Sequence, residues 1–572
     1  MSIFQTGFQF LFAFVLLLSI LIFVHELGHF LVARACGVRV LKFSIGFGPP
    51  IRIGRFQLAW KRSGTEYVIA WFPLGGFVKM LGENPDEVDD PEALAHPDEA
   101  LGAKNLWQKL AIVFAGPVMN LLLPVLVFLV TLAIGVQRPE AVIGSVEPGS
   151  PAARAGLVPG DRVTAVEGAP VAWWNDFDDA VRERPGAELP IQVARGDETH
   201  ALTLAVEKRP SFDELGQAVD AGWVGAGYRR IASMLGVPSA HAPAFAAGLR
   251  SGDVVKAVGG TAVESWEELV SAYAAAGSSG STSLQVERAH PDASATAAAA
   301  TPPEPEKLDV EVPALGSLDA LGVVPANVVV ERVEPDSPAA ATGIQPGDLI
   351  LALDGAPLGS FATFAETVRA SKGRPLALEI AREGEVRHVE LAPAMASVDV
   401  GLGVQEPRYR VGIAARAATL PGALGLDRER NPLVALPRAV EMTVDFTGSF
   451  LRGLGMMVTG QVSRNQIAGP IGIAEIAGNA MQQGWEAYLT ILVVISINLG
   501  ILNLLPIPIL DGGQALLFTI EALRRGPLSL RTREIVQQVG FTVLILIMGL
   551  AFWNDLSRSW LRLLDWLQSG PS

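Results

Sequence analysis

The residues with the clearest chemical potential form the segment HELGH at positions 25–29. His25 and His29 are four positions apart, so on a helix they share one face and can bind the same metal ion. Glu26 lies beside them and can accept a proton from a water on that metal. So short a motif also occurs by chance on surface helices. Here it follows an uncharged apolar run from Met1 to Val24, and ionisable groups inside a membrane are costly and usually functional.

Two histidines leave a tetrahedral zinc ion in need of a third protein ligand. Asp511 is the best candidate, in the segment NLLPIPILDGG. Pro506 and Pro508 prevent a regular helix there, and the Gly-Gly pair after Asp511 lets the backbone turn sharply. A carboxylate at this depth is expected to face a bundle interior rather than lipid. Helix capping is the alternative role for Asp511, and Glu521 is the next candidate ligand.

Four apolar segments are long enough to hold these residues in a membrane, since a span needs about 20 apolar residues. They are the N-terminal run with its continuation through HELGH, and the stretches 110–137, 487–510 and 535–554. The first has neither the basic flank nor the cleavage site of a signal peptide, so we expect it to remain as a span. A softer stretch, 433–462, carries charges at intervals and predicts an amphipathic helix in a membrane-surface region at 430–482.

Lysines and arginines near the spans predict the topology. Basic residues are frequent in the loop between the first two spans and in the loop between the last two, whereas the N-terminal flank has none. We therefore expect both basic loops in the cytoplasm, with both termini and the long segment from about 139 to 430 outside. This topology puts HELGH and Asp511 on the same side of the membrane, as a shared metal site requires.

The predicted exterior segment contains an internal repeat. The copies are SPAARAGLVPGDRVTAVEGAPV, APAFAAGLRSGDVVKAVGGTAV and SPAAATGIQPGDLILALDGAPL, at 150–171, 242–263 and 337–358. Each continues into a helix-like run and a closing strand, which gives a mixed α/β unit that resembles a PDZ domain. A solenoid is the alternative, but its period is usually about 20–50 residues. We expect units at 139–208, 209–315 and 322–396, the second being divergent and carrying a low-complexity linker at 289–306.

The composition is that of a membrane protein with sizeable polar domains. Of 572 residues, 50% are hydrophobic and only 18% are charged, against about 25% charged in average soluble domains. The formal net charge is −15 and no basic stripe stands out, so we expect no nucleic-acid partner. Cys36 is the only cysteine, which excludes an intrachain disulfide and a cysteine-based metal cluster.

The order of the motifs resembles the site-2 protease family of intramembrane zinc metalloproteases over nearly the whole chain. The motifs are HELGH, GFGP, TEYVIAWFPLGGFVKM, FAGPVMN, NQIAGPIGI and NLLPIPILDGG. The resemblance implies that His25, His29 and Asp511 bind zinc. It also implies that Glu26 is the general base and that Asn503 helps to hold the substrate. Close members have two tandem PDZ domains, whereas three such units are counted here.

The implied fold is a polytopic α-helical membrane protein with four transmembrane helices, a membrane-associated β-hairpin and inserted extracytoplasmic PDZ-like α/β domains. The membrane parts are expected at 1–138 and 483–572. A transmembrane helix hides its peptide bonds, so a substrate must unwind and have its backbone groups paired again. The segment 64–80, with Gly75 and Gly76, is predicted to be a hairpin that offers an edge strand for this pairing. An ordinary cytoplasmic hairpin is the alternative.

The implied function is cleavage of the transmembrane segment of single-pass membrane proteins, such as a trimmed anti-sigma factor or remnant signal peptides. The resemblance places this reaction at a bacterial inner membrane, in regulated intramembrane proteolysis, with the PDZ domains gating substrates by size. The ligands of the PDZ grooves are not predicted. A non-catalytic PDZ scaffold is one alternative, and the presence of His25 and Glu26 argues against it. A metal transporter is the other, but transporters commonly show repeated membrane halves, and no second HExxH is present.

Overall fold

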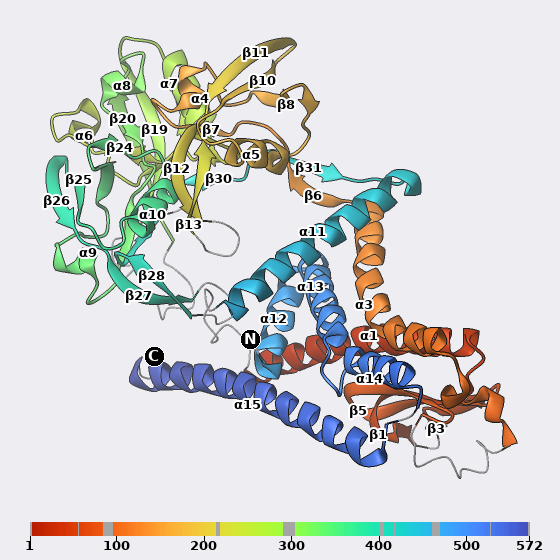
Figure 1. Cartoon of the computed structure of the whole chain (residues 1–572). Helices are drawn as coiled ribbons and strands as arrows, with labels where there is room; N and C mark the ends of the chain where they lie inside the picture. Colours follow the sequence, from red (N-terminus) through yellow and green to blue (C-terminus); the bar gives the residue numbers. More distant parts are fainter. Residues whose placement is uncertain are drawn as a thin grey trace. The chain divides into compact units, whose positions relative to one another are not determined.

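The chain divides into two compact units in a computed structural model (Figure 1). The membrane unit comprises Met1–Val136, Asp399–Gln405 and Asp427–Pro571, and the repeat unit comprises Gln137–Val398 and Glu406–Leu426. The structure describes residues 3–54, 56–83, 95–212, 218–289, 304–399, 405–416, 418–459, 469–526 and 528–569. Most of the predicted linker at 289–306 and the end of the predicted amphipathic stretch at 433–462 lie outside these ranges.

Four helices in the described part of the chain are long and apolar enough to cross a membrane. They are α1 (Ile3–Ala35), α3 (Leu106–Ile134), α13 (Trp485–Leu504) and α15 (Leu530–Ser569). These helices agree with the four predicted spans, although α13 ends at Leu504 rather than at 510. The reason is local, because Pro506 and Pro508 cannot continue a helix.

The helices α1, α3 and α13 pack around one apolar core that includes Leu17, Leu123 and Leu492. The helices α1 and α3 approach closely at HELGH, where a Cβ added to Gly28 would lie 2.4 Å from the carbonyl oxygen of Ala115. A side chain at position 28 would therefore force the two backbones apart. The glycine of HELGH brings α3 directly against the two histidines.

The described part of the membrane unit also includes the α-helices α11 (Pro432–Val458), α12 (Pro470–Gln483) and α14 (Asp511–Arg524). In α11, Ala435 and Ala439 are buried while Leu433 and Val444 are exposed. This helix is not among those apolar enough to span a membrane, which fits the predicted amphipathic character. Its location at a membrane surface stays a prediction.

The β-sheet of the membrane unit corrects the predicted hairpin. It contains β1 (Val40–Pro50), β4 (Ala59–Arg62) and β5 (Thr65–Met80), with the short strands β2 (Arg52–Ile53) and β3 (Phe56–Gln57) beside it. Phe43 of β1 is paired with Tyr67 on one side and with Val78 on the other. The two arms of β5 therefore flank β1 instead of pairing with each other, and the pairing predicted for 64–80 is wrong.

Over its described residues, the repeat unit contains three four-stranded sheets of identical connectivity, drawn from yellow to green in Figure 1. The first has the order β11-β10-β8-β9, and the other two have β20-β19-β17-β18 and β26-β25-β23-β24. One helix covers each sheet, namely α5 (Trp174–Arg182), α7 (Trp266–Ala275) and α10 (Phe361–Ala370). In the first sheet, β8 to β11 are Arg162–Val166, Ala169–Pro170, Glu188–Arg195 and Glu198–Ala205. In the second, β17 to β20 are Val254–Val258, Thr261–Ala262, Ser281–Arg288 and Glu306–Pro313. In the third, β23 to β26 are Leu349–Leu353, Ala356–Pro357, Leu376–Arg382 and Glu385–Leu391.

Each of the three sheets has its own apolar core, and residues downstream of the closing strand complete it. Val224, Val323 and Val411 are each at most 4% exposed and belong to the first, second and third core. All three lie beyond the unit boundaries predicted at 208, 315 and 396. A unit boundary placed at the end of the repeated pattern therefore omits part of each core.

The Gly-Asp pair of each repeat contributes a buried carboxylate to an ion pair. Asp161, Asp253 and Asp348 are at most 1% exposed. Each accepts two hydrogen bonds of 2.7 Å from an arginine at the end of the closing strand, which is Arg195, Arg288 or Arg382. The same arginine also donates to a glycine carbonyl of the repeat. The aspartate thus ties the chain just before the first strand of each sheet to the end of the third strand.

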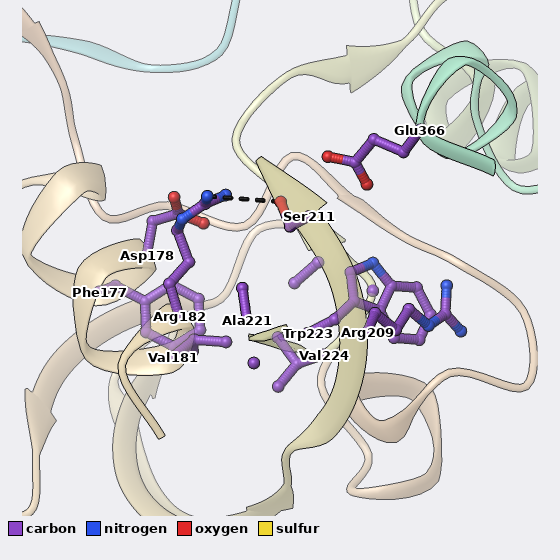
Figure 2. A pocket seen from close by; sticks show the side chains of 13 residues that line it. Phe177, Asp178, Val181, Arg182, Arg209, Ser211, Ala221, Trp223, Val224 and Glu366 are labelled. Atoms are coloured by element: carbon purple, nitrogen blue, oxygen red, sulfur yellow. Dashed lines mark hydrogen bonds between the residues drawn. The ribbon is translucent and has the colours of Figure 1, made fainter. Parts of the chain in front are cut away.

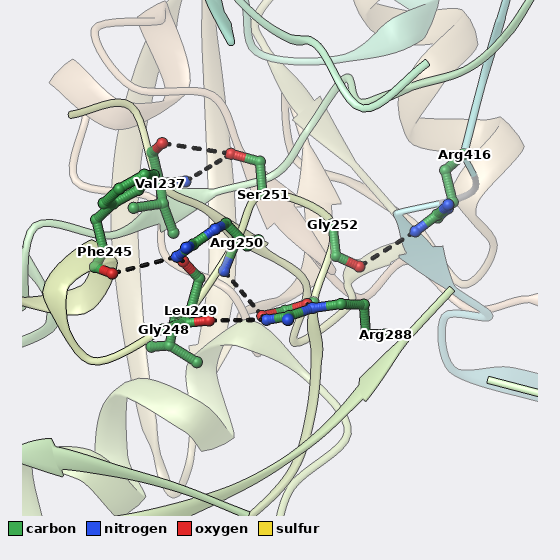
Figure 3. A network of polar contacts seen from close by, with 10 residues as sticks. Val237, Phe245, Gly248, Leu249, Arg250, Ser251, Gly252, Arg288 and Arg416 are labelled. Atoms are coloured by element: carbon green, nitrogen blue, oxygen red, sulfur yellow. Dashed lines mark hydrogen bonds and ion pairs between the residues drawn. The ribbon is translucent and has the colours of Figure 1, made fainter. Parts of the chain in front are cut away.

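A returning segment at 411–423 contacts all three repeats. Its strand β29 (Ile413–Ala415) pairs with β22 (Val330–Val333), and β30 (Thr419–Leu420) pairs with β15 (Arg230–Ile231). Between them, Arg416 donates to the carbonyl oxygen of Gly252 at 3.2 Å (Figure 3). The carbonyl of Ala423 then accepts from the backbone of Glu140 at 2.9 Å. The three repeats are therefore joined into one body.

Candidate metal centre

The structure brings His25 and His29 of α1 together with Asp511, the first residue of α14. The Nε2 atoms of the two histidines are 3.2 Å apart. Asp511 Oδ2 is 3.2 Å from His25 Nε2, and Asp511 Oδ1 is 3.6 Å from His29 Nε2. Among the described residues, these form the cluster whose donor atoms can hold a metal ion.

The spacing of these three donors fits zinc. Ligands at about 2.0–2.1 Å from a tetrahedral zinc ion lie about 3.3–3.4 Å from one another. The observed separations of 3.2, 3.2 and 3.6 Å are close to that tetrahedral edge. Asp511 Oδ2 is also buried and makes no hydrogen bond within the part of the chain that the structure describes. A buried carboxylate oxygen without a hydrogen bond is expected where a metal ion is its partner. Two histidines and one carboxylate leave a fourth position open, as in catalytic zinc sites.

The hydrogen bond of His29 fixes which of its ring nitrogens can bind a metal. Its Nδ1 lies 2.8 Å from the carbonyl oxygen of Ile112 in α3. A carbonyl only accepts, so Nδ1 must carry the proton and the lone pair is on Nε2. Neutral Nε2 is the form that a metal requires, and such outer hydrogen bonds orient the ring.

Gly116 of α3 faces both imidazole rings. A Cβ added at this position would lie 2.3 Å from His29 Nε2 and 2.7 Å from His25 Cε1. Any side chain would therefore displace the rings from their present positions. Gly116 belongs to the motif FAGPVMN, for which the sequence alone predicts no role. The signal that could have revealed one was a glycine within an otherwise bulky span.

The segment before Asp511 explains how the carboxylate reaches the histidines. The chain leaves α13 at Leu504 and re-enters a helix at Asp511. A Cβ at Gly512 would lie 2.3 Å from the carbonyl oxygen of Leu504, and one at Gly513 would lie 2.1 Å from that of Ile507. The two glycines are thus needed for close packing of α14 on this loop. They are in the helix itself, which corrects the expectation that they form a sharp turn.

Two expectations about carboxylates near this loop are also resolved. The N-cap residue of α14 is Leu510, so Asp511 is not the helix cap. Glu521 accepts hydrogen bonds from Arg533 and from the backbone of Leu528 at 2.9 Å. It therefore braces the connection between α14 and α15 and is not in the metal cluster.

The outer arm of β5, residues 76–80, passes beside Glu26, the predicted base. A Cβ at Gly76 would lie 3.1 Å from Glu26 Cγ and 2.7 Å from Ile22 Cγ2. Gly75 has φ of +157° and lies under the ring of Phe47. Because Gly76 lacks a side chain, the arm lies close against α1 at Glu26. Asn503 is half-buried in the last turn of α13, before the loop that leads to Asp511.

A separate pocket in the repeat unit carries charged side chains but no metal cluster among its described residues (Figure 2). It has a volume of about 80 Å³ and lies between α5 and the strand β13 (Ala218–Trp223). Asp178 and Arg182 of α5 line it, opposite Glu366 of α10. Burial raises the pKa of Asp178 above its ordinary value.

Comparison with known proteins gives one family and several relatives. The model of peptidase family M50 matches residues 13–547. The "Regulator of sigma-E protease RseP" of Escherichia coli strain K12 is 33% identical over 553 residues, which cover 96% of this chain and 98% of the relative. A "Putative zinc metalloprotease" of Xylella fastidiosa strain Temecula1 is 32% identical over 548 residues, with coverage of 94% and 96%.

Two solved structures of PDZ domains are also similar to parts of the chain. The PDZ domain of an SdrC-like protein from Listeria monocytogenes is 21% identical, with a TM-score of 0.13, and covers 16% of this chain and 90% of that one. A PDZ domain protein from Parabacteroides distasonis is 9% identical, with a TM-score of 0.12, and covers 48% and 95%. At these TM-scores neither likeness carries an argument about the fold.

Proposed function

The chain belongs to peptidase family M50 and is a zinc metalloprotease, and on that premise we propose that it cleaves transmembrane segments of single-pass membrane proteins. The observation that carries this proposal is the metal cluster itself. Its three donors lie at tetrahedral spacing, and two of them belong to a helix apolar enough to span a membrane. A hydrolytic site held at that depth acts on peptide bonds that lie within the membrane.

The residues of the chain divide the chemistry between them. His25, His29 and Asp511 would hold zinc, which when bound polarises a carbonyl and lowers the pKa of a water molecule to about 7. Glu26 accepts the proton from the attacking water and delivers it to the leaving amine. Ile112 keeps His29 in the tautomer that binds metal, through its carbonyl oxygen.

The outer arm of β5 is the proposed binding strand for the unwound substrate. Among the described strands it pairs with β1 along one edge, and on the other edge the N–H of Met80 donates to Glu83 Oε2 at 3.1 Å, so the outer edge of residues 76–78 is the proposed site of β-addition. The arm lies next to Glu26 at Gly76. Substrate backbone groups paired there would be satisfied within the membrane and held beside the base. Gly75, Gly76 and Asn503 are the proposed substrate-binding residues.

We assign the enzyme to a bacterial inner membrane. Relatives named regulators of sigma-E protease support a trimmed anti-sigma factor as a substrate. Remnant signal peptides are a second proposed substrate class, because they too are single membrane-spanning segments. The distribution of basic residues supports a cytoplasmic active site, with both termini and the repeats on the outer side. The repeats then act as a size filter that admits substrates whose exterior part has been removed.

The test combines metal content with cleavage. The wild type purified in detergent should hold one zinc ion and cut a single-span model substrate, and a zinc chelator should abolish cutting reversibly. His25→Ala, His29→Ala and Asp511→Ala should each lose zinc, because each removes a donor. Glu521→Ala is the matched control and should keep zinc, since Glu521 bonds to Arg533. A wild type that cuts without bound metal would overturn the proposal, as would Asp511→Ala with full zinc and full activity.

A further inference from the structure

Asn120 is a fully buried polar residue in the span α3, one turn beyond Gly116. Its side-chain amide lies 3.1 Å from Nδ1 of His25 through the atom assigned as Nδ2. The other amide atom, Oδ1, is buried and has no hydrogen-bond partner among the described residues. An amide with an unused acceptor, placed against the ring of a metal ligand, requires an explanation.

The protonation of His25 decides how this amide must be oriented. His25 Nε2 faces Asp511 and His29, so a metal bound there takes the lone pair of Nε2. Neutral imidazole has one N–H, and the proton must then be on Nδ1, which becomes a donor. An amide NH₂ cannot accept from it. Rotation of the amide by 180° exchanges Oδ1 and Nδ2, two atoms whose assignment follows from the hydrogen-bond network.

We infer that Asn120 is a positioning residue for the metal, in which Oδ1 accepts a hydrogen bond from Nδ1–H of His25. This inference rests on the proposed zinc site. It gives the orphaned acceptor a partner and fixes His25 in the tautomer that binds metal. It also makes the two histidines equivalent, because His29 already donates from Nδ1 to Ile112 on the same helix. The span α3 thus orients both rings through Nδ1, the ring nitrogen that does not bind the metal.

The backbone of α3 holds Asn120 in place. Pro124 has no N–H, so the carbonyl of Asn120, four residues earlier, is released from the helical ladder. The hydroxyl of Ser496, which is fully buried in α13, donates to this carbonyl at 2.6 Å. The bond ties α3 to α13 at the residue that orients His25. The motif FAGPVMN therefore supplies both the free space at Gly116 and the acceptor at Asn120.

The test measures zinc affinity, by competition with a chelator, and the absorption of the cobalt-substituted protein. Asn120→Leu keeps the size of the side chain and removes the acceptor, so zinc should bind about 10–100-fold more weakly. Asn120→Asp presents an oxygen in either orientation and should bind zinc at least as tightly as the wild type. Tyr488→Phe is the matched control, because it removes a buried bond between spans, to Ala13 at 2.8 Å, away from the metal ligands. It should leave zinc affinity within about threefold of the wild type.

The outcomes separate this inference from the proposed function. A wild type without zinc affinity overturns the zinc site and with it this inference. A folded Asn120→Leu that binds zinc as tightly as the wild type overturns the role of Asn120 alone. If Asn120→Leu does not fold, the zinc affinity of Asn120→Asp decides whether Asn120 accepts a hydrogen bond from His25. Should Asn120→Asp bind zinc tenfold more weakly, the amide donates to His25 and the inference is wrong, whereas retained affinity and a tetrahedral cobalt spectrum support it.

Discussion

At the scale of single residues, Gly116 is the position where the smallest change should have the largest effect on the metal site. In Gly116→Ala the new methyl group would lie 2.3 Å from His29 Nε2, so the ring must rotate away from Asp511. We predict that zinc binding falls at least tenfold, measured as metal content after dialysis against a weak chelator. Gly549→Ala is the control, since no atom lies within 4 Å of its added Cβ. Equal zinc content in the two variants would contradict this prediction and would show that α3 moves to accommodate the methyl group.

Asp178 provides a pH-dependent prediction outside the membrane unit. Burial raises the pKa of its carboxyl, while Arg182 opposes the shift and Asp179 and Glu366 add to it. A carboxyl with a raised pKa penalises the folded state as it ionises, so stability is lost as the pH rises above about 4. Asp178→Asn should therefore raise the melting temperature at pH 7 relative to the wild type, and this gain should shrink toward pH 4. A gain of the same size at both pH values would contradict the assigned cause.

The sequence reveals the proposed metal ligands and the proposed base more readily than the residues that position them. His25, Glu26 and His29 are recognisable because their types and helical spacing already define a metal site. The number of ligands that zinc needs calls for a third donor, for which Asp511 is the best candidate in the sequence, and the structure places it beside both histidines. The roles of Gly116 and Asn120 depend on what lies opposite them on another helix, and one chain segment cannot show this.

At the scale of elements, the membrane sheet shows why a local pattern predicts strands better than pairing. Alternation and the Gly-Gly pair correctly indicate extended arms on both sides of Gly75. A third strand, β1, is apolar enough to fit between these arms, and its pairs with Tyr67 and Val78 use both of its edges. Nothing within 64–80 distinguishes a partner in the same segment from a strand that lies earlier in the sequence, such as β1.

The repeats yield an element-scale prediction about the buried aspartates. In Asp253→Ala, Arg288 loses both bonds of 2.7 Å to the carboxylate and the backbone of Arg250 loses its acceptor. Loss of hydrogen bonds to a charged group should reduce the free energy of unfolding of the repeat unit by about 3 kcal/mol. Glu385→Ala removes an exposed pair with Arg387 and should cost less than about 1 kcal/mol. Chemical denaturation of both variants measures the contrast, and equal losses would count against a structural role for the Gly-Asp motif.

At the scale of the whole molecule, the returning segment determines how the repeats can be removed. A deletion that ended at the last repeat strand would leave β29 and β30 without their partners. The flanking chain ends are adjacent, because Arg428 donates to the carbonyl of Ala133 at 3.0 Å and the backbone of Glu429 donates to that of Leu132 at 2.9 Å. A short glycine-serine linker in place of residues 137–426 also removes Asp399–Gln405, and it should leave the rest of the membrane unit, Met1–Val136 and Asp427–Pro571, intact.

We predict that this linker variant binds zinc and cleaves a substrate that still carries its folded exterior domain, whereas the intact enzyme cuts the trimmed form. Exclusion by folded bulk does not depend on ionic strength, unlike repulsion between exposed charges, which salt screens beyond about 8–10 Å. The intact enzyme should therefore discriminate equally at low and high salt. If the zinc-loaded variant cuts only trimmed substrate, the repeats recruit substrates instead of excluding them.

The most direct test of the central claim is the substitution Glu26→Gln, with zinc content and cleavage of a single-span substrate measured on the same preparation. Glutamine keeps the size of the side chain beside Gly76 but cannot accept the proton of the attacking water. Glu486→Gln, at the start of α13, is the matched control. We predict full zinc content in both variants and a loss of cleavage of about 10²–10⁴-fold in Glu26→Gln alone. A zinc-loaded Glu26→Gln enzyme that cleaves as fast as the control would contradict the assignment of this site as the protease centre.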